Sequence, residues 1–166
     1  MKTLKLSILF IVLLFSTSAF AVSAKDLAKF TPDKIGDFTA TETATIQDIN
    51  KANGMLHRVQ RAYKSDKGLM CVIAIIEGAE VTNNIKAIFS KEGKKTMIGN
   101  FEVIQMTPKD NQFMVQSSVK LSKQCLLTVV VLNTNDINVP IKIIKKINLN
   151  DLAKIVAEND ASKSVF

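Results

Sequence analysis

Two apolar runs decide the fold, Leu69-Met-Cys-Val-Ile-Ala-Ile-Ile76 and Cys125-Leu-Leu-Thr-Val-Val-Val-Leu132. Both runs are short and rich in β-branched residues, and neither alternates apolar with polar side chains. A strand with one face in water alternates, whereas a strand covered on both faces reads as a continuous apolar run. The two runs therefore predict central strands of a sheet whose two faces are both covered by helices.

The flanking sequence supplies the remaining elements of an α+β domain. Residues 25–38 predict a short helix or turn and an irregular lead-in, and Asn53-Gly54 predicts a hairpin because both residues tolerate positive φ. Apolar spacing predicts one helix at 79–91 and a second helical region from Asn138 that breaks around 148–150 and resumes. We expect a mainly antiparallel sheet of about six to seven strands, with helices on both faces. Its outer strands are expected at 39–49, 55–64, 101–107 and 113–121, with a short additional strand at 93–99 as an open alternative.

In this element order the chain resembles the PsbP/Mog1-type fold, an antiparallel sheet with helices on both sides and a helix near the C-terminus. The resemblance covers most of the chain after residue 24. It rests on element order, and no motif carries a functional residue over to this sequence. That fold hosts binding and assembly roles, so the resemblance implies a non-catalytic accessory protein, although a fold alone does not fix a function.

Residues 1–24 have the pattern of a secretory signal peptide: a basic start, an apolar core of about ten residues, and an A-x-A ending. The apolar core is shorter than the roughly 20 residues of a membrane-spanning helix. Cleavage after Ala21 or after Ala24 fits, and Ala24 is preferred because Lys25 and Asp26 open a polar stretch. We therefore expect a periplasmic or secreted bacterial protein without a transmembrane segment, with one domain at 25–160 and a loose tail at 161–166.

The charge pattern argues against nucleic acid as a partner. The full chain has a formal net charge of +7, but its lysines are scattered and form no basic stripe with stacking aromatics. A cluster of lysines lies beside the apolar stripe of the C-terminal helical region, and such a cluster could bind an anionic membrane surface. A solvated outer face of a core-packed helix is the favoured interpretation. The cluster consists of Lys142, Lys145, Lys146 and Lys154.

Few residues in the chain support catalysis or metal binding. His57 is the only histidine, and no nucleophile motif such as G-x-S-x-G accompanies it, so a surface strand position is favoured for it. His57, Arg58 and Arg61 could together form an anion site. Glu77 and the other glutamates are expected to be solvated. One histidine and two distant cysteines lack the spacing of a metal site, so no metal or cofactor is predicted.

Cys71 and Cys125 form the candidate disulfide, because exported proteins commonly oxidise their cysteines. If their strands were antiparallel neighbours, the two cysteines would lie at opposite ends of the sheet, about 20 Å apart. A disulfide needs Cα atoms within about 7 Å. The cysteines share one end if the chain crosses over directly to the strand at 101–107, and the bridge fails if 93–99 is itself the strand that takes the crossover. The alternative is a pair of buried thiols.

Together these observations predict an exported, non-enzymatic binding or accessory module for a protein or a cell-envelope component. The alternative is a carrier of small molecules or lipids, with an apolar pocket between sheet and helix. A third hypothesis is a hydrolase that uses His57.

Overall fold

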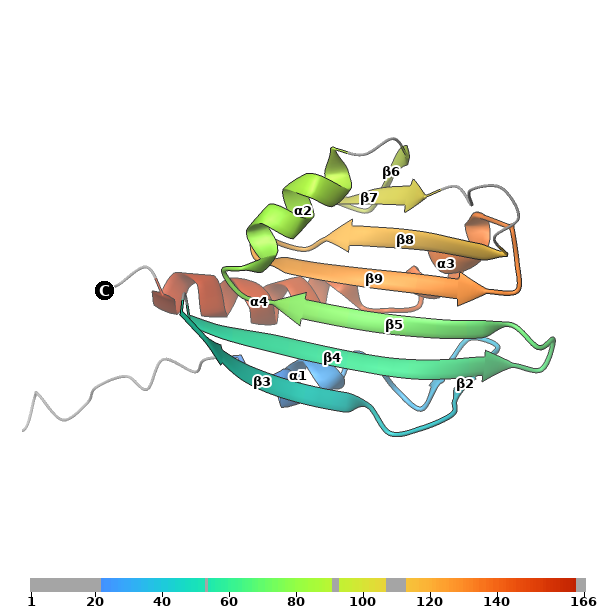
Figure 1. The fold of residues 1–166 in the computed structure, drawn as a ribbon, viewed down its shortest axis with the longest axis horizontal. Coiled ribbons are helices and arrows are strands. Elements are labelled where there is room, and N and C mark those ends of the chain that lie inside the picture. The colour runs from blue at the N-terminus through green and yellow to red at the C-terminus, as the bar shows by residue number, and fades with distance from the viewer. Residues whose placement is uncertain (1–21, 53, 91–92, 107–112, 164–166) are drawn as a thin grey trace, which may run out of the picture.

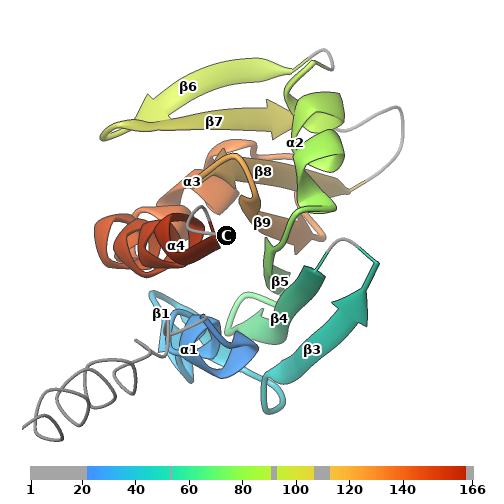
Figure 2. The ribbon, with the colours of Figure 1, turned by 90° about the vertical axis from the view of Figure 1, so that its left-hand side faces the viewer.

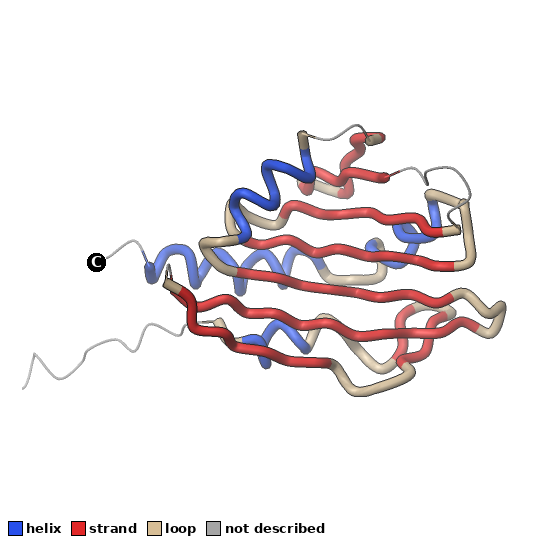
Figure 3. Tube along the Cα trace, viewed as in Figure 1, coloured by secondary structure: helices blue, strands red, loops and turns tan. Residues whose placement is uncertain are grey.

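The computed structural model describes residues 22–52, 54–90, 93–106 and 113–163. Within these ranges nine strands form one sheet with four helices against it, which confirms the α+β class (Figures 1 and 3). Every pairing is antiparallel, and the order is β1-β2-β4-β5-β9-β8-β7-β6, with β3 also beside β4. The strands are β1 (Lys34–Ile35), β2 (Phe38–Ala40), β3 (Thr45–Lys51), β4 (Gly54–Ser65), β5 (Met70–Glu77), β6 (Lys94–Ile98), β7 (Phe101–Met106), β8 (Met114–Lys120) and β9 (Cys125–Leu132).

The sheet has more strands than the six to seven expected, because the segment before β4 contributes three. The single strand predicted at 39–49 is two strands, β2 and β3, which pair with opposite ends of β4. β4 is 12 residues long, and this length lets both short strands lie along it. The hairpin predicted at Asn53-Gly54 joins β3 to β4, with Lys51 opposite Gly54, while Asn53 itself lies outside the described residues.

One face of the sheet, called here the inner face, carries most of the hydrophobic core. Three helices pack on it: α1 (Ala24–Ala28), α3 (Asn138–Ile144) and α4 (Leu149–Lys163) (Figure 2). Ser23 caps α1 through a reciprocal hydrogen-bond pair with Asp26, which satisfies backbone donors of the first turn. The break predicted at 148–150 falls slightly earlier, at 145–148, and α4 continues to Lys163, beyond the predicted start of the tail at 161. Residues 164–166 lie outside the described residues.

The opposite, outer face is only partly covered. It carries α2 (Val81–Phe89), which packs on Ile76 and Leu126 at one end of the sheet. A helix of 9 residues is about 13 Å long, whereas a strand of 8 residues is about 26 Å long. Helices do lie on both faces, but the predicted burial of the central strands on both faces is wrong for β5: its inward residues are buried, and its outward residues are half-buried or exposed.

The topology separates the two cysteines. Residues 94–98 form a genuine strand, β6, and it takes the crossover from α2, so β5 and β9 run antiparallel as neighbours. Cys71 then pairs with Val131, and Cys125 pairs with Glu77, which places the cysteines at opposite ends of their strands, about 20 Å apart. Among the described residues no disulfide joins these two buried cysteines, so the favoured bridge is not formed. The reason is the crossover: the segment at 94–98 is itself the strand that takes it, as the alternative at 93–99 had allowed.

Candidate functional site

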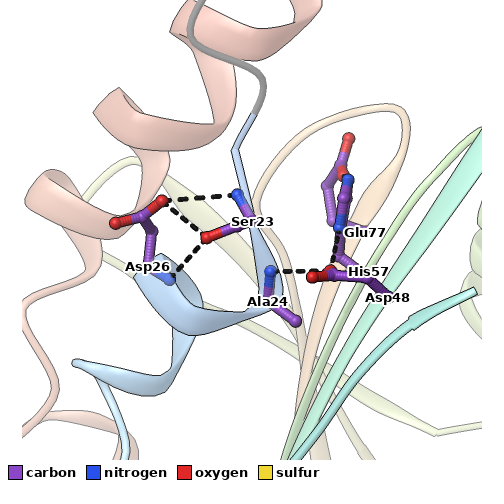
Figure 4. Close-up of polar contacts among 6 residues, drawn as sticks. All are labelled: Ser23, Ala24, Asp26, Asp48, His57 and Glu77. Carbon is purple, nitrogen blue, oxygen red and sulfur yellow. Dashed lines mark hydrogen bonds and ion pairs between the residues drawn. The ribbon is translucent and has the colours of Figure 1, made fainter.

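Three ionisable side chains meet at one end of the inner face, although they come from three different strands. Asp48 on β3 is the register partner of His57 on β4, and His57 is the register partner of Glu77 on β5. Figure 4 shows the three side chains together beside the start of α1. His57 is 4% exposed and Glu77 is fully buried, so the predictions of a surface histidine and a solvated glutamate are both wrong.

The histidine lies between the two carboxyl groups. Its Nδ1 is 2.5 Å from Oδ1 of Asp48, and its Nε2 is 3.6 Å from Oε2 of Glu77. An ionised carboxylate only accepts hydrogen bonds, so Nδ1 donates to Asp48. The same oxygen of Asp48 accepts a second hydrogen bond, 2.9 Å long, from the backbone N–H of Ala24. Asp48 therefore joins the first residue of α1 to β3 and β4.

The contacts of Asp48 favour its ionised form. The hydrogen bond from His57 is the largest influence and lowers the pKa of Asp48 below its normal value; burial opposes it, and the Ala24 N–H contributes a smaller lowering. Charge-assisted hydrogen bonds are about twice as strong as neutral ones. We call this arrangement of Ala24, Asp48, His57 and Glu77 the polar latch, because it fixes the N-terminal helix to the sheet.

The polar latch does not have the geometry of a hydrolase. In a nucleophile–histidine–acid triad one imidazole nitrogen faces an acid and the other faces the nucleophile. Here both ring nitrogens face carboxyl groups, and the ring is closed off from solvent. A metal centre is not indicated either, since the described residues contain no group of three or more His, Cys, Asp or Glu side chains suited to a metal ion.

The anion site proposed from sequence is not assembled. The alternation of β4 places His57 and Arg61 on the inner face and Arg58 on the outer face. Arg61 donates hydrogen bonds to the backbone oxygens of Thr31 and Glu42 and pairs with Asp33, so its guanidinium holds the N-terminal segment against β4. The exposed Arg58 donates to Gln60. The three side chains therefore do not converge on one ligand.

A surface that sequence reasoning missed lies on the outer face beyond α2. Strand pairing sets Met70, Leu132 and Met114 side by side across β5, β9 and β8, with Val72 and Val130 in the adjacent row. Met70 is 44% and Met114 38% exposed, and the other three side chains are half-buried. We call these five residues the open patch. Figure 1 shows α2 across one end of this face, with the rest of the face free of helices.

One cationic residue adjoins the open patch. Lys64 on β4 is the register partner of Met70, whereas the exposed Arg58 and Lys120 are the register partners of Ile76 and Leu126, at the end of the face that α2 covers. Register alone brings Lys64 beside the patch, and the signal available in the sequence was the unusual apolarity of outward positions in β5 and β9.

Compared with protein-family models, with curated proteins and with solved structures, the chain shows no significant match. The resemblance to the PsbP/Mog1-type fold therefore stays a prediction. Among the described helices, none has both the length and the apolarity needed to cross a bilayer.

Proposed function

We propose that the protein is an exported, non-catalytic binding module that docks a protein partner through the open patch. The observation that carries this proposal is the contiguous set of apolar side chains on a sheet face that α2 leaves uncovered. Contiguous exposed apolar surface of this kind marks interaction sites in soluble proteins. A flat sheet face suits a macromolecular surface better than a small ligand, since small-molecule sites are concave.

The charge beside the patch indicates the chemistry of the partner. Lys64 would face an acidic group at the edge of an apolar partner surface, because complementary charge at the edge of an interface steers association and selects partners. A second copy of this chain would bring a lysine and not an acidic group to that edge, so a different protein fits better. The space between the sheet and α3 and α4 is filled by buried side chains, which argues against a carrier with a pocket inside that core.

Export is part of the proposal, and the start of the fold supports one of the two cleavage positions expected from sequence. Val22 is 5% exposed, Ala24 is fully buried, and Ser23 caps α1. Cleavage after Ala24 would remove all three residues, and loss of a helix cap alone costs about 0.5–2 kcal/mol. We therefore place cleavage after Ala21, in place of the Ala24 preferred from sequence. The intact mass of the exported protein tests this: a chain that begins at Lys25 would contradict it.

Site-specific photo-crosslinking in the native host tests the docking surface. A photoreactive residue at Met70 should give an adduct with one defined partner, and the same residue at Lys154 should not, because Lys154 is exposed on α4, on the opposite side of the sheet. Lys64→Glu should reduce the adduct severalfold, with Lys154→Glu as the matched control. Equal adducts from both positions, or an adduct with the mass of a homodimer alone, would overturn the proposed docking surface.

A further inference from the structure

A concave site lies between the helical layer and a turn of the sheet, away from the flat open patch. It is a groove with a volume of about 590 Å³, within the range of about 300–1,000 Å³ typical of small-molecule sites. Three segments form its walls: the β1–β2 hairpin, the β4–β5 turn, and α3 together with Lys146, two residues beyond its end. Its lining residues used here are Ile35, Phe38, Leu69, Ile143, Lys142 and Lys146.

The floor of the groove is apolar. Ile35, Phe38 and Ile143 are buried members of the main core, and Leu69 is half-buried against the same core. These side chains come from segments far apart in sequence, so the groove exists only because the hairpin and the turn fold against α3. An apolar floor of this kind can hold a hydrocarbon chain, because burial of apolar area contributes roughly 25 cal/mol per Å².

The two walls differ in charge. Lys142 and Lys146 are spaced one helical turn apart on the α3 side, and that wall has no acidic lining residue. The opposite wall carries Asp37, Asp66 and Lys67. Among the described residues no ion pair involves Lys67, Lys142 or Lys146, so no carboxylate there lies within 4.0 Å of the ammonium groups on the α3 side.

We propose that this groove binds a single-chain carboxylate amphiphile, with the hydrocarbon chain on the apolar floor and the carboxylate at Lys142 and Lys146. A smaller pocket of about 210 Å³ shares Ile35 and Lys146 with the groove and continues toward Phe30 and Ile147, which gives a longer chain room to extend. The ligand is a free amphiphile and not a membrane surface, because the lysines line a concavity. This site is separate from the docking function of the open patch and does not depend on it.

The test uses dodecanoate below its micelle-forming concentration, with the folded protein, in isothermal titration calorimetry. We expect saturable one-to-one binding. The double variant Lys142→Glu/Lys146→Glu should weaken binding about tenfold, because it replaces two attractions by two repulsions. Lys145→Glu is the matched control: Lys145 lies between the two lysines in sequence and is exposed, but does not line the groove. Leu69→Asp tests the apolar floor and should also weaken binding.

Four outcomes would overturn the proposal. They are the absence of saturable dodecanoate binding, equal affinity for dodecyltrimethylammonium, an equal loss in Lys145→Glu, and binding only to vesicles that contain phosphatidylglycerol. Far-UV circular dichroism of each variant shows whether it is folded, and the exposed lysine variants should keep the wild-type spectrum because their side chains contribute nothing to the core.

Discussion

Replacement of Asp48 by alanine tests whether the polar latch stabilises the fold. The substitution removes the acceptor of two hydrogen bonds, from Ala24 N–H and from Nδ1 of His57, and both donors belong to buried residues. A hydrogen bond to a charged group contributes about 1.5–3 kcal/mol, and a buried donor left without an acceptor carries a comparable penalty. Because the side chain of Asp48 is 41% exposed, water can replace part of what is lost. We therefore expect Asp48→Ala to lower the free energy of unfolding by about 2–4 kcal/mol.

Urea unfolding followed by far-UV circular dichroism measures this loss. Asp48→Asn keeps an oxygen that can accept from Ala24 but removes the charge, so its loss should be intermediate. Glu42→Ala is the control, since Glu42 is exposed and its side chain makes no hydrogen bond or ion pair with the described residues; its change should stay within about 0.5 kcal/mol. If Asp48→Ala unfolds at the same urea concentration as Glu42→Ala, the latch contributes nothing and the reasoning is refuted.

The pH dependence of stability gives an independent check of the latch. The folded-state pKa of Asp48 lies below its normal value of 3.8, chiefly because of the His57 hydrogen bond. Its contribution is therefore present above the unfolded-state pKa and is lost as the pH falls through the lower folded-state pKa. When the pH is lowered from about 5, the free energy of unfolding of Asp48→Ala should fall less than that of the wild type. Equal slopes of this free energy against pH in the two proteins would contradict the assignment.

Three further predictions follow from the structure. Gly78→Ala should lower the free energy of unfolding by about 2 kcal/mol or more, because Gly78 has φ 149° and a Cβ would lie 2.7 Å from the Met55 backbone oxygen. Gly68→Ala is the control: Gly68 has φ 77° with open space around it, so the loss in the same urea assay should be smaller. Burial raises the pKa of Cys71 to about 12, so the thiol of the native protein should resist alkylation. After denaturation without reduction, the protein should gain two alkyl groups by mass spectrometry. If the denatured protein gains none before reduction, the prediction is contradicted. The Lys29 and Ser23 hydrogen bonds lower the pKa of Asp26 to about 2. Asp26 therefore stabilises α1 above its normal pKa of 3.8, and this stabilisation is lost as the pH falls toward 2. Asp26→Asn should flatten the dependence of the free energy of unfolding on pH over that window.

Local sequence signals were sufficient to predict the longer elements, but not the short strands β1 and β2. The apolar runs at 69–76 and 125–132 are β5 and β9, the Asn-Gly pair marks the β3–β4 hairpin, and the helical spacing after residue 79 marks α2. Each of these signals depends on residues close together in sequence, where turn chemistry and periodicity act directly.

Features that depend on pairing between distant segments were not predictable. Asp48, His57 and Glu77 meet because of strand register, and a shift of one residue would send their side chains to opposite faces. The open patch depends on how far α2 extends along the sheet, and the length of a helix does not by itself reveal which strands it covers. The groove likewise needs the hairpin at 34–40, whose two short strands have no alternation long enough to be recognised.

The central pairing of β5 with β9 also sets the order in which the chain can fold. β5 emerges early but finds one of its two neighbours only after residues 125–132 are available, since β6, β7 and β8 come between them in sequence. Loop closure over such a separation makes folding slow relative to proteins dominated by local contacts. β5, one of the two strongly apolar strands of the sheet, therefore keeps one edge unpaired until residues 125–132 have been made.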